Sequence, residues 1–142
     1  MAAPGGVVVV SGGDDQSLHV TTLRVTDHET GSLAVGGTRR VESAHTSQVL
    51  GVCPVGTRCV LSAGLDQRFA VWRIEDSGDS DGSGGGSGSG SALSLARVQT
   101  ALTEVVDVDD VAAAPLPGGG WVAAVVGRGV QCLARAAGDE SG

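Results

Sequence analysis

The sequence predicts an all-β fold, made of short antiparallel strands that recur in similar units. Short apolar runs rich in valine alternate with turns that contain glycine, aspartate or proline. Valine favours strands because its branched Cβ packs well on a pleated surface. No window of about eleven residues combines the 3.6-residue period of a helix with helix caps. An internal repeat, described below, is the third observation that favours a β-sheet architecture.

Turn-forming residues separate the apolar runs, and each run is long enough to be a strand. The strand at 33–41 is weaker than the others because Gly36 and Gly37 interrupt it. The alanines at 112–114 could suggest a helix, but Pro115 and Pro117 would end it early. The predicted strands are residues 7–11, 17–23, 33–41, 49–53, 58–62, 68–74, 93–100, 107–113, 121–126 and 129–134.

A glycine- and serine-rich segment separates the predicted strands at 68–74 and 93–100. Residues 75–91 read EDSGDSDGSGGGSGSGS and contain no apolar side chain. Burial of apolar surface therefore cannot offset the entropy lost on ordering this segment. We expect a disordered acidic loop over 75–92 and a flexible tail over 136–142.

Two stretches of the chain share one pattern. Residues 8–16 and 59–67 both contain three apolar residues, then serine, a small residue, glycine, one variable residue and Asp-Gln. Alternating strand residues follow in both stretches. Such self-similarity is typical of repeat architectures in which each unit is one small sheet.

The second unit also contains His45, Ser62, Asp66 and Trp72 in the order and spacing of a WD repeat. The chain therefore resembles the WD-repeat family, whose members fold as β-propellers. The resemblance implies that these four side chains form a hydrogen-bonded structural tetrad, which satisfies their polar groups when they are buried. The pairs Ala44-His45 and Trp72-Arg73 depart from the usual Gly-His and Trp-Asp of the family.

The other units match the WD repeat less closely. The unit at 7–41 keeps Ser11 and Asp15 but has Thr21 in place of tryptophan, and the final unit at 105–135 lacks both the aspartate and the tryptophan. We expect a propeller fragment of about two to three four-stranded antiparallel blades over residues 7–135, with the full blade at 44–100. The first unit lacks an inner strand and the last lacks an outer one, which suggests a fragment or truncated gene model of a longer protein.

Two longer stretches carry a more specific resemblance. Residues 42–52 with 60–73, and residues 105–111 with 127–131, are similar to the C-terminal end of a WD-repeat family that binds a tRNA 2′-O-methyltransferase. This resemblance implies a non-catalytic scaffold that helps the enzyme modify the wobble nucleotide, position 34 of tRNA. The methyl donor would belong to the enzyme, and tRNA would be reached through the complex. The alternative is a generic protein–protein interaction module in another complex, in ubiquitination or trafficking.

The residues give no pattern typical of catalysis, of a cofactor or of a metal. His45, Ser62 and Asp66 fit the structural tetrad better than a catalytic triad, and no Gly-x-Ser-x-Gly turn is present. His19 and His28 lack further ligands at metal spacing. The acidic run at 107–110 lacks the glycine and glutamate of a calcium loop.

The charge distribution bears on possible partners. The net charge is −7, and all nine basic residues are scattered arginines, so tight non-specific binding of nucleic acid is not expected. The candidate partner-binding residues are Arg39, Arg40, Arg68 and Arg73, which could meet carboxylates or phosphates.

Cysteine usage and hydropathy indicate the compartment. The three cysteines are odd in number and form no Cys-x-x-Cys pair, which favours free thiols in a reducing environment. No signal peptide and no apolar run long enough to cross a membrane are present. We therefore expect a cytoplasmic protein.

Overall fold

The computed structural model describes residues 2–3, 6–77, 92–136 and 138. The all-β prediction is confirmed, because every regular element in these ranges is a strand. No element of the described residues is a helix long and apolar enough to cross a membrane. The strands are β1 (Ala2–Ala3), β2 (Gly6–Gly12), β3 (Leu18–Asp27), β4 (Ser32–Val41), β5 (Val49–Val55), β6 (Cys59–Gly64), β7 (Arg68–Ser77), β8 (Ala92–Leu102), β9 (Asp110–Pro115), β10 (Gly120–Gly127) and β11 (Gly129–Ala136).

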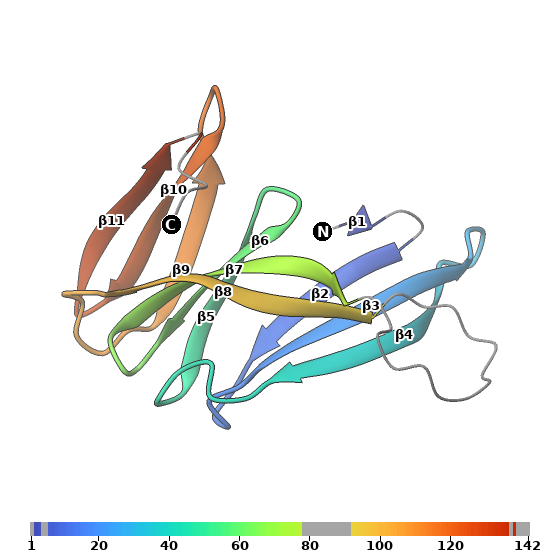
Figure 1. Ribbon diagram of the computed structural model, residues 1–142, viewed down its shortest axis with the longest axis horizontal. Coiled ribbons are helices and arrows are strands. Elements are labelled where there is room, and N and C mark those ends of the chain that lie inside the picture. The colour runs from blue at the N-terminus through green and yellow to red at the C-terminus, as the bar shows by residue number, and fades with distance from the viewer. Residues whose placement is uncertain (1, 4–5, 78–91, 137, 139–142) are drawn as a thin grey trace.

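The strands form three antiparallel sheets that follow one another along the chain (Figure 1). The first sheet has the order β1-β2-β3-β4, the second β5-β6-β7-β8 and the third β9-β10-β11. Within each sheet every strand pairs antiparallel with its neighbour in sequence. Strand β5, the first strand of the second sheet, lies beside both β2 of the first sheet and β9 of the third.

The second sheet is buried on both faces. Successive side chains of β7 point to opposite faces, as in any strand. Phe69 and Val71 join a core cluster shared with Trp121 and Val125 of the third sheet. Trp72 and Ile74 join a cluster that also holds Leu18 and Val20 of the first sheet. The two cores therefore fix the second sheet between its neighbours.

The structure differs from the predicted strands at several places, and three of them have a clear cause. The two-residue strand β1 pairs with β2, so the first sheet has a strand that the sequence analysis did not include. Strand β9 begins at Asp110 rather than 107, because Asp107 has a left-handed φ of 49° that is incompatible with a strand. Strand β4 continues through the expected interruption, because Gly36 is accommodated as an irregularity where β3 partners shift from Gly37 to Val35.

The predicted acidic loop is shorter than expected at both ends. Strand β7 extends to Ser77 and β8 starts at Ala92, so residues 75–77 and 92 pair within the second sheet. The remainder of that prediction, residues 78–91, lies outside the described residues. The expected tail also lies largely outside them, and Ala136 ends β11.

Candidate functional site

The structure brings His45, Ser62, Asp66 and Trp72 together at one end of the second sheet. His45 precedes β5, Ser62 lies in β6, Asp66 lies in the β6–β7 turn, and Trp72 lies in β7. The side chains of His45 and Asp66 are 1% and 4% exposed, and Ser62 is fully buried. A buried polar group needs a hydrogen-bond partner, so the arrangement must satisfy its own donors and acceptors.

The distances define one consistent chain of hydrogen bonds. Nδ1 of His45 lies 3.0 Å from Oδ1 of Asp66, and its Nε2 lies 2.8 Å from Oγ of Ser62. Nε1 of Trp72 donates to the same Ser62 oxygen over 2.8 Å. Because a carboxylate only accepts, His45 donates from Nδ1, and its Nε2 accepts the Ser62 hydroxyl proton. Every polar atom of the network then has a partner.

Asp66 also accepts hydrogen bonds from two backbone N–H groups, one before β5 and one at the start of β7. The N–H of Thr46 donates to Oδ2 over 2.8 Å, and the N–H of Arg68 donates to Oδ1 over 3.1 Å. Burial raises the pKa of the Asp66 carboxyl, but these bonds and His45 outweigh burial and hold that pKa below its usual value. The carboxylate is therefore ionised at neutral pH, and it connects the turn to His45, Thr46 and Arg68 through hydrogen bonds that it accepts.

Gly64 makes room for this network. A Cβ at this position would lie 2.6 Å from Nδ1 of His45 and 2.7 Å from Oδ1 of Asp66. Such distances are far inside van der Waals contact, so any larger residue would displace the imidazole or the carboxylate. Close approach therefore explains the glycine in the second unit, but not Gly13 in the first, where a Cβ would make only a 3.6 Å contact with Asp15.

The first sheet repeats the turn without the full network. Oδ1 of Asp15 accepts from the N–H of Ser17 over 3.2 Å, as Oδ1 of Asp66 does from that of Arg68. The glutamines after the two aspartates both have a left-handed φ, 65° at Gln16 and 57° at Gln67. The repeat in sequence is therefore a repeat in backbone geometry.

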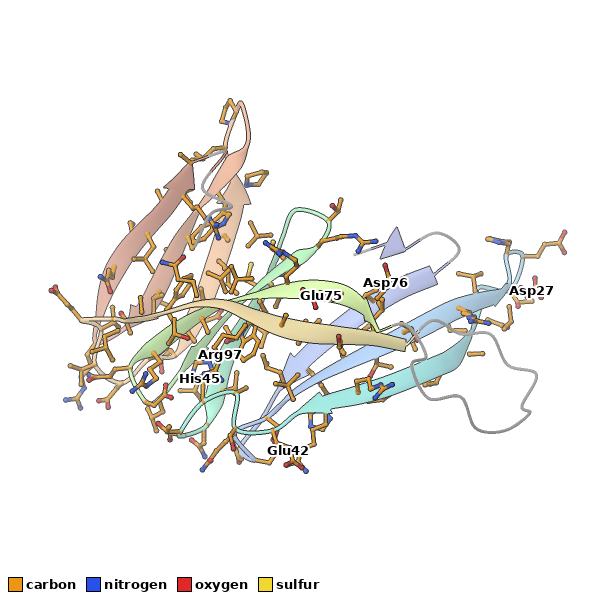
Figure 2. The ribbon with its side chains drawn as sticks, viewed as in Figure 1. Asp27, Glu42, His45, Glu75, Asp76 and Arg97 are labelled. Carbon is orange, nitrogen blue, oxygen red and sulfur yellow. The ribbon has the colours of Figure 1, made fainter. Side chains whose placement is uncertain are left out.

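Arg97 is a structural residue that the sequence analysis missed. Its guanidinium lies over the Trp72 ring, 4.8 Å from the centroid, and Nη2 donates to the carbonyls of Ser43 and Ala44. Figure 2 shows His45 and Arg97 at the same end of the second sheet. Cation–π contact and two charge-assisted bonds hold β8 against the loop before β5. Nothing in the local sequence of β8 signals this contact.

The four candidate partner-binding arginines have different surroundings. Arg40 is exposed but bonded to the first sheet, with Nη2 3.1 Å from Oδ2 of Asp15 and Nε donating to Oγ of Ser17 over 3.0 Å. Arg39 and Arg68 are exposed, whereas Arg73 is half-buried and lines a cavity between the second and third sheets. The four residues therefore do not form one surface patch.

The chemistry available to the network is structural. The Ser62 oxygen is fully buried and already accepts from Trp72, so a substrate has no approach to it. In the part of the chain that the structure describes, no three His, Cys, Asp or Glu side chains are grouped to hold a metal ion. Asp107, from the acidic run, instead pairs with Nε of Arg128 at 2.9 Å.

No protein-family model matches the chain, and no curated protein matches it.

Proposed function

We propose that the chain is part of a WD-repeat β-propeller that acts as a non-catalytic scaffold. The observation that supports this proposal is the buried network of His45, Ser62, Asp66 and Trp72 in a four-stranded antiparallel sheet. Consecutive antiparallel sheets in chain order, with β5 beside both β2 and β9, are also compatible with neighbouring propeller blades. A closed ring holds roughly four to eight blades, so the proposal requires blades beyond these three sheets.

We further propose that the scaffold is the regulatory partner of a tRNA 2′-O-methyltransferase that acts on the wobble nucleotide 34. Support comes from residues 42–52 with 60–73, and residues 105–111 with 127–131, which are similar to the C-terminal part of WD repeat-containing protein 6. The enzyme would supply the catalytic groups and bind the methyl donor. The few scattered arginines of this chain agree with contact to tRNA mainly through the enzyme.

Copurification and deletion test the proposal together. We expect the tagged protein to copurify with a methyltransferase from its own cells, and deletion to abolish 2′-O-methylation of nucleotide 34, measured by mass spectrometry of tRNA digests. Re-expression of the wild-type gene should restore the modification. Deletion that leaves this modification unchanged would refute the methyltransferase role, and copurification with a ubiquitin ligase or coat complex would favour the alternative adaptor.

A further inference from the structure

A cavity of about 310 Å³ lies between the second and third sheets. It opens where the β5–β6 and β9–β10 turns lie, since residues 55–59 and Pro115 and Gly120 line it. The buried network involves the β6–β7 turn, at the other end of β6 from the β5–β6 turn. The cavity is therefore separate from the structural tetrad.

The two sheets present arginines to this cavity from opposite walls. On the second sheet, Arg73 continues the face of β7 that carries Phe69 and Val71, which pack toward the third sheet. On the third sheet, Arg135 lines the cavity and pairs in register with Trp121. Arg58, the last residue of the β5–β6 turn, is the third basic residue of the lining.

Among the described residues, the lining contains no acidic side chain, although the chain carries a net charge of −7. Arg58 has a carboxylate outside the lining, because Oδ2 of Asp76 accepts from both of its terminal nitrogens at 3.2 Å. No hydrogen bond or ion pair joins the Arg73 side chain to another side chain or backbone group in the described ranges. The half-buried guanidinium of Arg73 therefore leaves the cavity with positive charge that an anion would neutralise.

The rest of the wall is apolar. Val55, Val71, Val98, Pro115 and Trp121 line the cavity beside the arginines. Such a mixture fits a ligand that carries one anionic group next to apolar side chains. A nucleic-acid backbone, with a charge at every nucleotide and no apolar side chain, fits it poorly.

We propose that this cavity binds a carboxylate on an otherwise apolar peptide segment of a partner protein. The Arg73 guanidinium holds the carboxylate, and the apolar wall holds the neighbouring side chains of the peptide. This binding site goes beyond the scaffold role and does not depend on the partner being a methyltransferase.

The test is a titration of the ¹⁵N-labelled full chain with acetyl-Leu-Asp-Val-amide, whose only charge is the aspartate carboxylate. The indole N–H of Trp121 and the amides of Gly56 and Gly120 should shift saturably, because all three residues line the cavity. The indole N–H of Trp72, bonded to Ser62, should stay unchanged as an internal reference for folding. The matched peptide acetyl-Leu-Asn-Val-amide should bind at least about tenfold more weakly, since it lacks the charge-assisted bond.

Variants assign the effect to Arg73. Arg73→Gln should weaken binding of the aspartate peptide about tenfold or more, and Arg73→Lys should weaken it less because the charge remains. Arg128→Gln, which changes an exposed arginine outside the cavity, is the matched control and should bind like the wild type. If Arg73→Gln loses the Trp72 reference signal, Arg135→Gln replaces it as the test variant.

The proposal is overturned by any of three results. The first is the absence of saturable shifts at Trp121, and the second is equal binding of the aspartate and asparagine peptides. The third is wild-type affinity in both Arg73→Gln and Arg135→Gln. Inorganic phosphate forms a separate arm: binding as tight as that of the peptide would show that the apolar wall contributes nothing and would exclude a peptide ligand.

Discussion

Asp66 is the residue on which the stability of the second sheet depends most directly. Its two oxygens accept from His45, Thr46 and Arg68, so Asp66→Ala leaves the buried His45 N–H without its partner and removes two bonds to backbone N–H groups. We expect the free energy of unfolding to fall by about 1–3 kcal/mol. Urea denaturation followed by tryptophan fluorescence measures this change.

Asp14→Ala is the matched control, since Asp14 is the exposed neighbour of the corresponding turn residue in the first sheet. It should unfold within about 0.5 kcal/mol of the wild type. An unchanged urea-unfolding midpoint for Asp66→Ala would show that the hydrogen-bonded network does not stabilise the fold.

The lowered pKa of Asp66 also predicts how stability depends on pH. The folded state binds its proton less readily than the unfolded state, in which the pKa is about 4. The stabilisation from this carboxylate is therefore complete above about pH 4 and is lost as the pH falls through the lower, folded pKa. Asp15 and Asp27 have lowered pKa values too and add to the same trend.

The comparison of wild type with Asp66→Asn isolates the contribution of Asp66. Urea unfolding at a series of pH values should show a smaller acid-induced loss of stability in the variant. Parallel curves for the two proteins below pH 4 would show that the Asp66 carboxylate is not more acidic in the folded state.

Side chains that follow a repeated pattern could be located from the sequence, whereas those fixed by distant packing could not. The spacing of His45, Ser62 and Asp66 predicted that they meet, and the structure brings them together. Arg97 could not be found in this way, because its contacts to Ser43 and Ala44 join residues more than fifty positions apart. Such contacts depend on which strands become neighbours rather than on local order.

At the scale of strands, the close approach of β5 and β9 depends on Gly51. A Cβ at this position would lie 2.5 Å from the backbone nitrogen of Val111, which cannot move without shifting β9. We expect Gly51→Ala to lower the free energy of unfolding by about 1–3 kcal/mol through overpacking. Thermal unfolding followed by circular dichroism measures the loss.

Gly13→Ala is a suitable control, because its Cβ would make only an ordinary 3.6 Å contact with Asp15. It should melt close to the wild type. If Gly51→Ala melts together with this control, the second and third sheets do not pack as tightly as described.

The strand pattern was largely predictable because valine runs and turn residues act locally. The exceptions are elements without such a signal. The two alanines of β1 contain no alternation, and they pair only because β2 offers an edge. Strand β9 starts later in the chain than predicted, because Asp107 adopts a left-handed conformation beside Gly127. A Cβ on Gly127 would overlap the Asp107 carbonyl.

At the scale of the whole molecule, the two outer sheets differ from the second in having one face without a neighbouring sheet among the described residues. The repeat and the tetrad predicted sheets of this size, but the cavity between the second and third sheets could not be predicted. The arginines that line this cavity are Arg58, Arg73 and Arg135, and no sequence motif connects them. Their convergence follows from the order in which the sheets pack.

The open face of the third sheet is apolar, and it predicts self-association of the isolated chain. Trp121, Ala123 and Val125 point to the core, so the alternate residues of β10 and β11 form the opposite face. These are Val122, Ala124, Val126, Val130, Cys132 and Ala134, and Val130 is 68% exposed. In the described residues β11 pairs only with β10, so its outer edge is also open to another strand.

We therefore expect the average mass in sedimentation velocity to rise with protein concentration, because exposed apolar faces and open edges associate. Val130→Glu should shift the association to concentrations at least about tenfold higher, since each copy would have to bury a charge at the contact. Leu116→Glu, in the β9–β10 turn of the same sheet, changes the net charge equally but lies outside this face, and it should associate like the wild type. A wild-type chain that stays monomeric, or equal effects of the two substitutions, would show that this face does not drive association.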